Sequence, residues 1–118
     1  MATILVVDDE ATNRLLIRSI LTLHDVREAE GAESAFAQLR ASTPDLIILD
    51  VAMPVMNGFE FLKRLRTEMA CEARVLLYTA TRPDDTMRDI ASTYRVSGFL
   101  PKPCDPRETI RIVEEALA

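Results

Sequence analysis

Tryptophan is absent from this sequence, and glycine, histidine and cysteine are scarce. Aromatic residues amount to only 5%, so aliphatic residues must fill any core. Cys71 and Cys104 lie far apart without CxxC or Cys/His spacing, which argues against a zinc site and indicates free thiols in a reducing compartment. The longest apolar runs have the length of a strand, and no charged-then-apolar leader opens the chain. We therefore expect a cytoplasmic protein that has no membrane partner.

Positive charge is also in short supply. Lys and Arg number 14 against 19 Asp and Glu, which gives a formal net charge of −5. Nucleic-acid backbones are held by basic surfaces, so we expect no direct nucleic-acid partner, whereas a divalent cation or a basic partner fits this charge. At 118 residues and 48% hydrophobic content, the chain is long enough for one core and too short for two. We expect a single domain over residues 1–118.

Short apolar segments alternate with segments of helical periodicity along the chain. The expected strands are residues 3–10, 26–30, 46–50, 74–80 and 97–103. The expected helices run from about 11 to 23, from 32 to 40, from about 58 onward, from 83 to about 94, and from 106 to 118. Asn57 and Pro83 mark two of the helix starts. The half-polar segment 26–30 indicates a strand nearer an edge.

Apolar residues at helical spacing define the faces that should turn toward the core. These residues are Leu16, Ile20, Leu23, Ala35, Phe36, Leu39, Phe61, Leu62, Leu65, Ile110, Val113 and Leu117. Five strand–helix units in this length predict an α/β fold with a five-stranded parallel sheet, helices on both faces and right-handed crossovers.

Parallel strands end at the same edge of a sheet, so this edge should collect the polar residues that follow each strand. Asp8 and Asp9 follow the first strand, Asp50 the third, Thr79 the fourth and Lys102 the fifth. Three neighbouring carboxylates repel one another unless a cation intervenes, and a shallow site of oxygen ligands suits Mg²⁺.

Asp50 is the expected nucleophile of this site. A carboxylate beside Mg²⁺ and the Lys102 ammonium is arranged to attack phosphorus, because both cations stabilise charge on the phosphoryl oxygens. The loop that follows it contains Pro54 and Gly58 and should leave Asp50 exposed.

Four motifs give the sequence a resemblance to a known family. In their order and spacing, "ILVVDDE", "LIILDVAMPVMNGFEFL", "LLYTA" and "GFLPKP" resemble the receiver domains of two-component response regulators over the whole chain. The resemblance implies a flavodoxin-like doubly wound (βα)5 fold with strand order 2-1-3-4-5. It also implies that Asp8, Asp9, Asp50 and the backbone carbonyl of Ala52 hold Mg²⁺. Asp50 would accept phosphate from the phosphohistidine of a histidine kinase or phosphotransfer protein.

The resemblance extends to a switch. Thr79 would bind the phosphoryl group through its hydroxyl, Lys102 would pair with it, and the peptide bond before Pro103 would be cis. Phe99 falls at the switch aromatic position, and without a hydroxyl it would act by burial alone. The surface of helix 83–94, strand 97–103 and helix 106–118 would bind a downstream effector domain or protein. Such a domain catalyses only its own phosphorylation and dephosphorylation.

Other interpretations apply to the same residues. Each acid, Thr79 or Lys102 taken alone is an ordinary strand-end, cap or surface residue. An FMN-binding domain would share the architecture but needs a Ser/Thr/Gly-rich loop after the first strand, where this sequence has acids. A phosphatase acting through an aspartyl phosphate would need a second acid at the position of Ala52. His24 is interpreted as a helix end and Cys104 as a small buried filler, with a redox role left open.

The sequence leaves several properties open. It names neither the cognate kinase nor the output pathway, and it does not set the lifetime of the phosphorylated state. A complete single-domain regulator and a fragment of a larger protein would look the same. A homodimer through the last two helices is one arrangement that the sequence allows.

Overall fold

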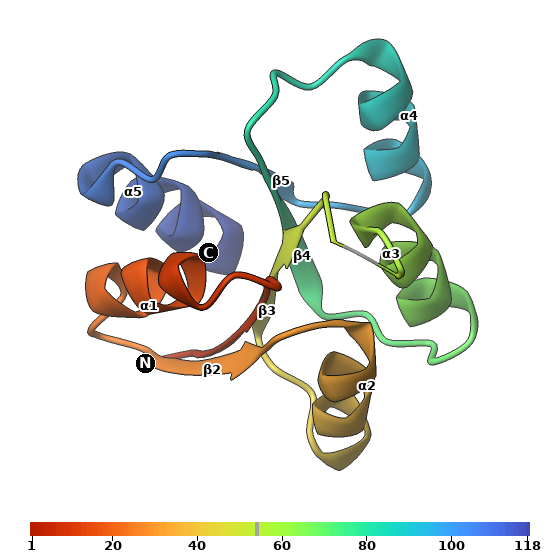
Figure 1. The fold of residues 1–118 in the computed structure, drawn as a ribbon, viewed down its shortest axis with the longest axis horizontal. Coiled ribbons are helices and arrows are strands. Elements are labelled where there is room, and N and C mark those ends of the chain that lie inside the picture. Colours follow the sequence, from red (N-terminus) through yellow and green to blue (C-terminus); the bar gives the residue numbers. More distant parts are fainter. Residues whose placement is uncertain (54) are drawn as a thin grey trace.

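The computed structural model describes residues 1–53 and 55–118, and strands alternate with helices throughout (Figure 1). The elements are β1 (Thr3–Val7), α1 (Ala11–Ile20), β2 (Asp25–Ala29), α2 (Ala32–Ala41), β3 (Leu46–Asp50), α3 (Gly58–Thr67), β4 (Arg74–Thr79), α4 (Asp85–Thr93), β5 (Gly98–Pro101) and α5 (Pro106–Leu117). The strands form one parallel sheet in the order β2-β1-β3-β4-β5. The predicted fold class and strand order are confirmed.

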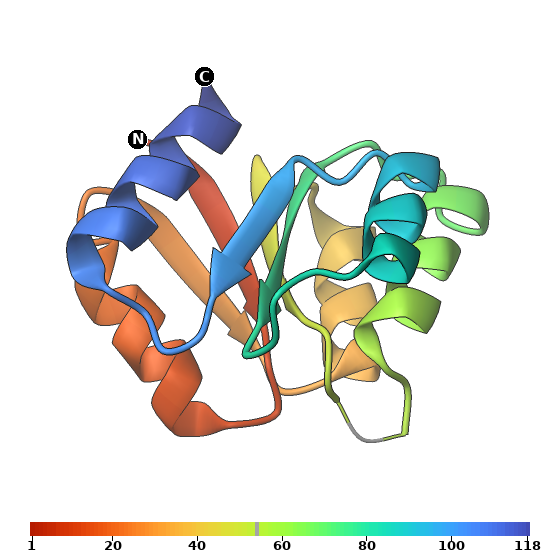
Figure 2. The same cartoon turned by 90° about the horizontal axis from the view of Figure 1, so that it is seen from above.

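Helices cover both faces of the sheet (Figure 2). Helices α1 and α5 lie on one face, and α2, α3 and α4 lie on the other. The central strand β3 is buried along its whole length, as its unbroken apolar run predicts for a strand covered on both sides. The half-polar β2 lies at an edge, as expected, and the apolar side chains form one core cluster on each face.

The predicted Asn57 cap is confirmed, whereas α4 begins at Asp85, two residues after the predicted start at Pro83. The Asn57 side chain accepts a hydrogen bond from the Glu60 N–H at the start of α3. Asp84 accepts one from the Met87 N–H at the start of α4, one residue after Pro83. These caps satisfy backbone donors that have no partner within the helix.

The first helix differs from its prediction. It ends at Ile20 rather than near residue 23, and Leu16 and Leu23 are 40% and 79% exposed. Ile17 and Leu21 are buried and belong to the cluster beneath α1, and Ile20 is partly buried and packs against the same cluster, as predicted. The centre of the buried stripe is therefore shifted by one position, because residues four apart share a helix face and the pair 17/21 was available as well as 16/20.

The last helix shows the same kind of error. Val113 is fully buried and Leu117 packs against the core, but Ile110 is 43% exposed. The buried position in that turn is held by Thr109, which is 1% exposed. The choice of Ile110 as a core residue from its apolar side chain was therefore wrong, because the packing of α5 on the sheet decides which helix face is buried.

A buried arginine ties α3 to the loops at the amino ends of β4 and β5. The Arg66 guanidinium donates hydrogen bonds to the backbone carbonyls of Cys71, Ala73, Tyr94 and Arg95 at 2.7–3.3 Å. Burial lowers the pKa of Arg66. The carbonyls replace the water that this side chain would otherwise bind, so the end of α4 is fixed against α3.

No helix in the described part of the chain combines the length and the apolarity needed to cross a membrane.

Candidate functional site

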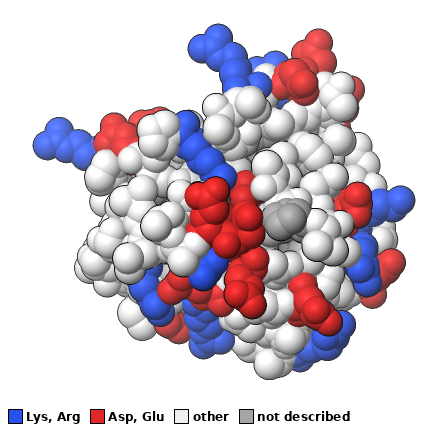
Figure 3. Space-filling model, in the orientation of Figure 1, with Lys and Arg blue, Asp and Glu red and all other residues white. Residues whose placement is uncertain are grey.

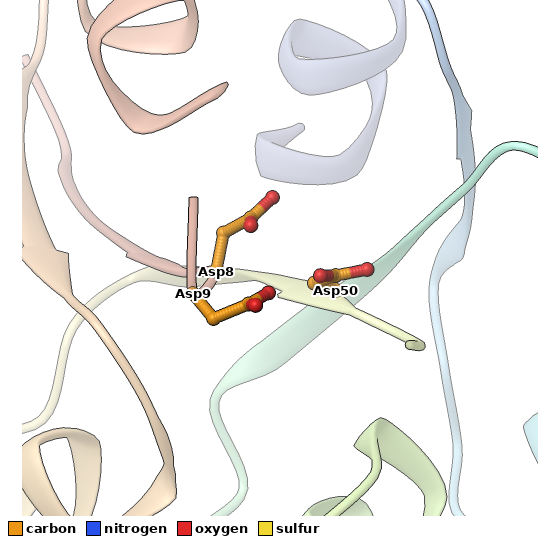
Figure 4. A group of neighbouring side chains, drawn as sticks. All are labelled: Asp8, Asp9 and Asp50. Atoms are coloured by element: carbon orange, nitrogen blue, oxygen red, sulfur yellow. The ribbon is translucent and has the colours of Figure 1, made fainter. Parts of the chain in front are cut away.

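The acids predicted to form a site meet at the carboxyl edge of the sheet. Asp8 and Asp9 follow β1 directly, and Asp50 is the last residue of β3. One carboxylate oxygen from each lies within 4.8 Å of the others. Figure 4 shows the three side chains next to one another, with that of Asp9 pointing toward Asp50. In Figure 3, acidic side chains gather near the middle of this face, with a basic side chain beside them.

Asp8 is the most deeply buried of the three acids, with no exposed surface. Its carboxylate accepts hydrogen bonds from the Glu10 N–H at 2.9 Å and from Asn13 Nδ2 at 3.2 Å. Burial raises the pKa of Asp8, and the nearby Asp50 charge adds to the rise, because both disfavour the ionised form. The site therefore holds a carboxylate whose charge is only partly compensated.

Asp50 is buried, contrary to our expectation that its loop would leave it exposed. It is 3% exposed, and its Oδ1 accepts hydrogen bonds from the Ala52 N–H at 3.1 Å and from Lys102 Nζ at 2.9 Å. The reason lies in the loop after β3, which folds back so that the Gly58 N–H donates to the Val51 carbonyl at 2.9 Å. Pro54, which we expected to shape this loop, lies outside the described residues.

Gly58 is required for this close return of the chain. A Cβ atom at position 58 would lie 2.5 Å from the backbone oxygen of Asp50 and 2.9 Å from the Cα of Val51. Both contacts are with backbone, which cannot move aside as a flexible side chain does. The glycine in the motif therefore sets how closely α3 approaches the acidic residue.

Lys102 follows β5 directly and reaches the acids across the edge of the sheet. Its Nζ lies 2.9 Å from Asp50 Oδ1 and 3.7 Å from Asp8 Oδ2. Its backbone N–H donates to the Thr79 carbonyl at 2.9 Å, and the Lys102–Pro103 peptide bond is cis, as the resemblance implied. One ammonium thus stands against three carboxylates, and the residual negative charge suits a hard divalent cation with oxygen ligands.

Thr79 and Phe99 occupy different surroundings. The Thr79 hydroxyl accepts a hydrogen bond from the Thr81 N–H at 3.2 Å and lies 3.1 Å from the Thr81 hydroxyl. It is therefore engaged with its own loop. Phe99 is half-buried on β5 and packs against the core cluster on the α2, α3 and α4 face.

The described geometry agrees with one known family. Residues 4–114 match the response regulator receiver domain. The chain belongs to this family. This receiver domain is a signalling domain rather than a classical enzyme, so the FMN-binding and phosphatase alternatives are set aside. Membership also implies a kinase as partner.

Individual relatives resemble this receiver domain over nearly its full length. The solved structure of chemotaxis protein CheY4 of Vibrio cholerae matches with a TM-score of 0.90 and 29% identity, covering 99% of both chains. An uncharacterized 14.6 kDa protein of Leptolyngbya boryana is 36% identical, over 95% of this chain and 87% of that protein. The DNA-binding transcriptional regulator NtrC of Rhizobium meliloti is 35% identical over 99% of this chain, which spans 24% of its length.

Tyr78, beside the site, was missed by the sequence reasoning. The Tyr78 hydroxyl lies 3.0 Å from Cys104 Sγ, and the Tyr78 ring lies under the Lys102 ammonium at 4.6 Å from the ring centroid. Cys104 is half-buried rather than a buried filler. The available signal was the position of Tyr78 immediately before Thr79, which places it at the same edge of the sheet.

Proposed function

We propose that this receiver domain accepts a phosphoryl group on Asp50 from the phosphohistidine of a histidine kinase or phosphotransfer protein, in a reaction that depends on Mg²⁺. The observation that carries the proposal is the convergence of Asp50 with two further carboxylates within 4.8 Å and with the Lys102 ammonium at 2.9 Å. Asp8, Asp9, Asp50 and the Ala52 carbonyl would hold the metal, and their oxygen donors suit it. When bound, Mg²⁺ would neutralise charge on the phosphoryl oxygens.

The chain's own residues have separate tasks in this transfer. An Asp50 carboxylate oxygen attacks phosphorus, the P–N bond of the phosphohistidine breaks, and an acyl phosphate forms. Lys102 now pairs with Asp50 Oδ1 and is 19% exposed, whereas the Asp50 side chain is 4% exposed. The ammonium would move from that oxygen to a phosphoryl oxygen, which keeps it paired throughout the step.

The proposed switch follows from the added charge and acceptors. Thr79, now bonded to Thr81, would turn its hydroxyl to the phosphoryl group, and Phe99 would turn inward behind it. A full reversal of a two-state equilibrium requires roughly 5 kcal/mol of differential binding. The surface of α4, β5 and α5 would then bind a downstream effector. We propose that residues 1–118 act as a single cytoplasmic domain.

Intact mass spectrometry after incubation with acetyl phosphate tests the phosphoacceptor role. We expect one alkali-labile phosphoryl adduct that requires both Mg²⁺ and Asp50, and that is absent from Asp50→Asn. Glu72→Gln is the matched control, because it removes an exposed carboxylate that lies just before the amino end of β4, away from the carboxyl edge, and should leave the adduct unchanged. An adduct that persists in Asp50→Asn would contradict the proposal.

A further inference from the structure

We infer that Tyr78 is a positioning residue for Lys102, with its ring supporting the ammonium and its hydroxyl held by Cys104. The inference rests on the proposed role of Lys102 in phosphoryl transfer. It concerns the contact between the Tyr78 ring and the Lys102 ammonium, in which no proposed metal ligand takes part.

Tyr78 lies on β4, next to Asp50 in the sheet. It pairs in register with Asp50 across β3 and β4, and it is 1% exposed. Its backbone carbonyl accepts a hydrogen bond from the Val51 N–H at 3.2 Å, which binds its strand to the start of the loop after Asp50. A ring fixed to this strand is therefore also fixed relative to the proposed phosphoacceptor.

The ring and the acids act on the ammonium together. Lys102 Nζ lies 4.6 Å from the Tyr78 ring centroid and 2.9 Å from Asp50 Oδ1. The face of an aromatic ring attracts a cation, and the attraction is stronger where water is excluded. This attraction keeps the cation over the ring face but, unlike a hydrogen bond, does not tie it to one acceptor atom. The ammonium can therefore leave the Asp50 oxygen for a phosphoryl oxygen while it stays over the ring.

Cys104 closes the arrangement. Its Sγ lies 3.0 Å from the Tyr78 hydroxyl, and it stands two residues after Lys102. Lys102 is also held to Thr79, the residue after Tyr78, through its backbone N–H at 2.9 Å. The ring and the lysine are thus joined on two sides, by the 102–104 segment and by the strand, so movement of the ring would carry the lysine with it.

A purely structural role for Tyr78 makes a different prediction. Tyr78 belongs to the apolar cluster beneath α1 and α5, where a leucine would also fill space. A buried tyrosine hydroxyl needs a polar partner, so the Cys104 contact alone is explained by packing. The ring's effect on Lys102 separates the two roles, because phenylalanine retains it and leucine does not.

The test compares Tyr78→Leu and Tyr78→Phe in the rate of phosphorylation by acetyl phosphate at saturating Mg²⁺. We expect Tyr78→Leu to react about tenfold more slowly with unchanged Mg²⁺ affinity, and Tyr78→Phe to stay within about threefold of the wild type. Leu46→Ala is the matched control, because Leu46 lies in the same cluster at the other end of β3 and its loss should leave the rate unchanged. A wild-type rate in Tyr78→Leu, or an equal loss in Tyr78→Phe, would overturn the inference.

Nuclear magnetic resonance gives a second reading that does not require phosphorylation. A proton above a ring face is shifted upfield, so the Lys102 ε-methylene signals should be upfield in the wild type and in Tyr78→Phe and should lose this shift in Tyr78→Leu. Signals without an upfield shift in the wild type would overturn the inference. If the wild type forms no adduct but shows the shift, the proposed function fails while the positioning contact stands.

Discussion

Two regions of this domain bury charge, and they treat it differently. On the α3–α4 side, the Arg66 guanidinium is 8% exposed and finds four backbone carbonyls. At the carboxyl edge of the sheet, Asp8 and Asp50 share one ammonium beside the exposed Asp9, and the pKa of the buried Asp8 is raised. In the first region, backbone carbonyls of the same chain compensate the buried charge, and this stabilises the fold. The second leaves negative charge uncompensated, which is what a cation-binding site requires.

Removing the satisfied charge should have the largest effect on stability. Arg66→Met would leave four carbonyls without this donor and loosen the end of α4, so we expect the free energy of unfolding to fall by about 3 kcal/mol. Urea unfolding followed by circular dichroism measures the change. Arg40→Met is the control, since Arg40 lies on the exposed side of α2 and should change stability by less than about 0.5 kcal/mol. An equal loss of unfolding free energy in Arg66→Met and Arg40→Met would contradict the stabilising role of the Arg66 hydrogen bonds.

The stability of the domain should depend nearly as strongly on the close packing of Gly58 against the backbone of Asp50 and Val51. In Gly58→Ala, the added methyl group would meet the Asp50 oxygen and the Val51 Cα, and we expect a loss of about 2 kcal/mol together with weaker Mg²⁺ binding. Gly31→Ala is the matched control, because a Cβ at position 31 meets nothing within 4 Å. Thermal unfolding with and without Mg²⁺ measures both effects. A Gly58→Ala domain that binds Mg²⁺ normally would show that the loop adapts.

Removing one of the uncompensated charges should stabilise the metal-free domain. A carboxylate whose pKa is raised on folding weakens the folded state above its ordinary pKa, and this penalty disappears as the pH falls through the folded value to below the unfolded one. We therefore expect Asp8→Asn to be more stable than the wild type at pH 7, with the difference vanishing at acid pH. Chemical unfolding at a series of pH values measures it.

Magnesium should make the wild type more stable than Asp8→Asn, which reverses the order expected without the metal. At a concentration one hundred times the dissociation constant, a ligand of the folded state adds about 2.7 kcal/mol of stability. The wild type should gain this stabilisation, and Asp8→Asn should gain little. If both proteins respond equally to Mg²⁺, Asp8 is not part of the metal site.

Much of this arrangement was predictable because periodicity and strand ends are local properties. The apolar run of residues 46–49 predicted a buried central strand, and the acids after β1 and β3 predicted a common edge. The burial of Asp50 was not predictable, because it depends on how the loop returns to Gly58 and on Lys102, which is 52 residues away. The Arg66 contacts could not be predicted either, since nothing in the sequence distinguishes Arg66 from Arg64, the other arginine on α3.

The errors in helix facing have the same origin. Leu16 and Ile17 are both apolar, and only the packing of α1 on the sheet decides which one is buried. Tyr78 escaped notice because tyrosine is common in strands, and its relation to Lys102 arises only when β4 and β5 are paired.

The smallest predicted effect concerns the end of α4, beside the Arg66 contacts. Arg95 has φ of 58°, in the left-handed region that favours glycine, and it also forms an exposed ion pair with Glu72 at 2.9 Å. Relief of the backbone strain in Arg95→Gly should outweigh the loss of an exposed ion pair, which contributes only a few tenths of a kcal/mol. We expect a net gain of about 0.5 kcal/mol in unfolding experiments, whereas Arg95→Ala keeps the strain, loses the pair and should be slightly less stable than the wild type. If Arg95→Gly and Arg95→Ala are equally stable, the carbonyls bound by Arg66 already hold this turn without measurable strain.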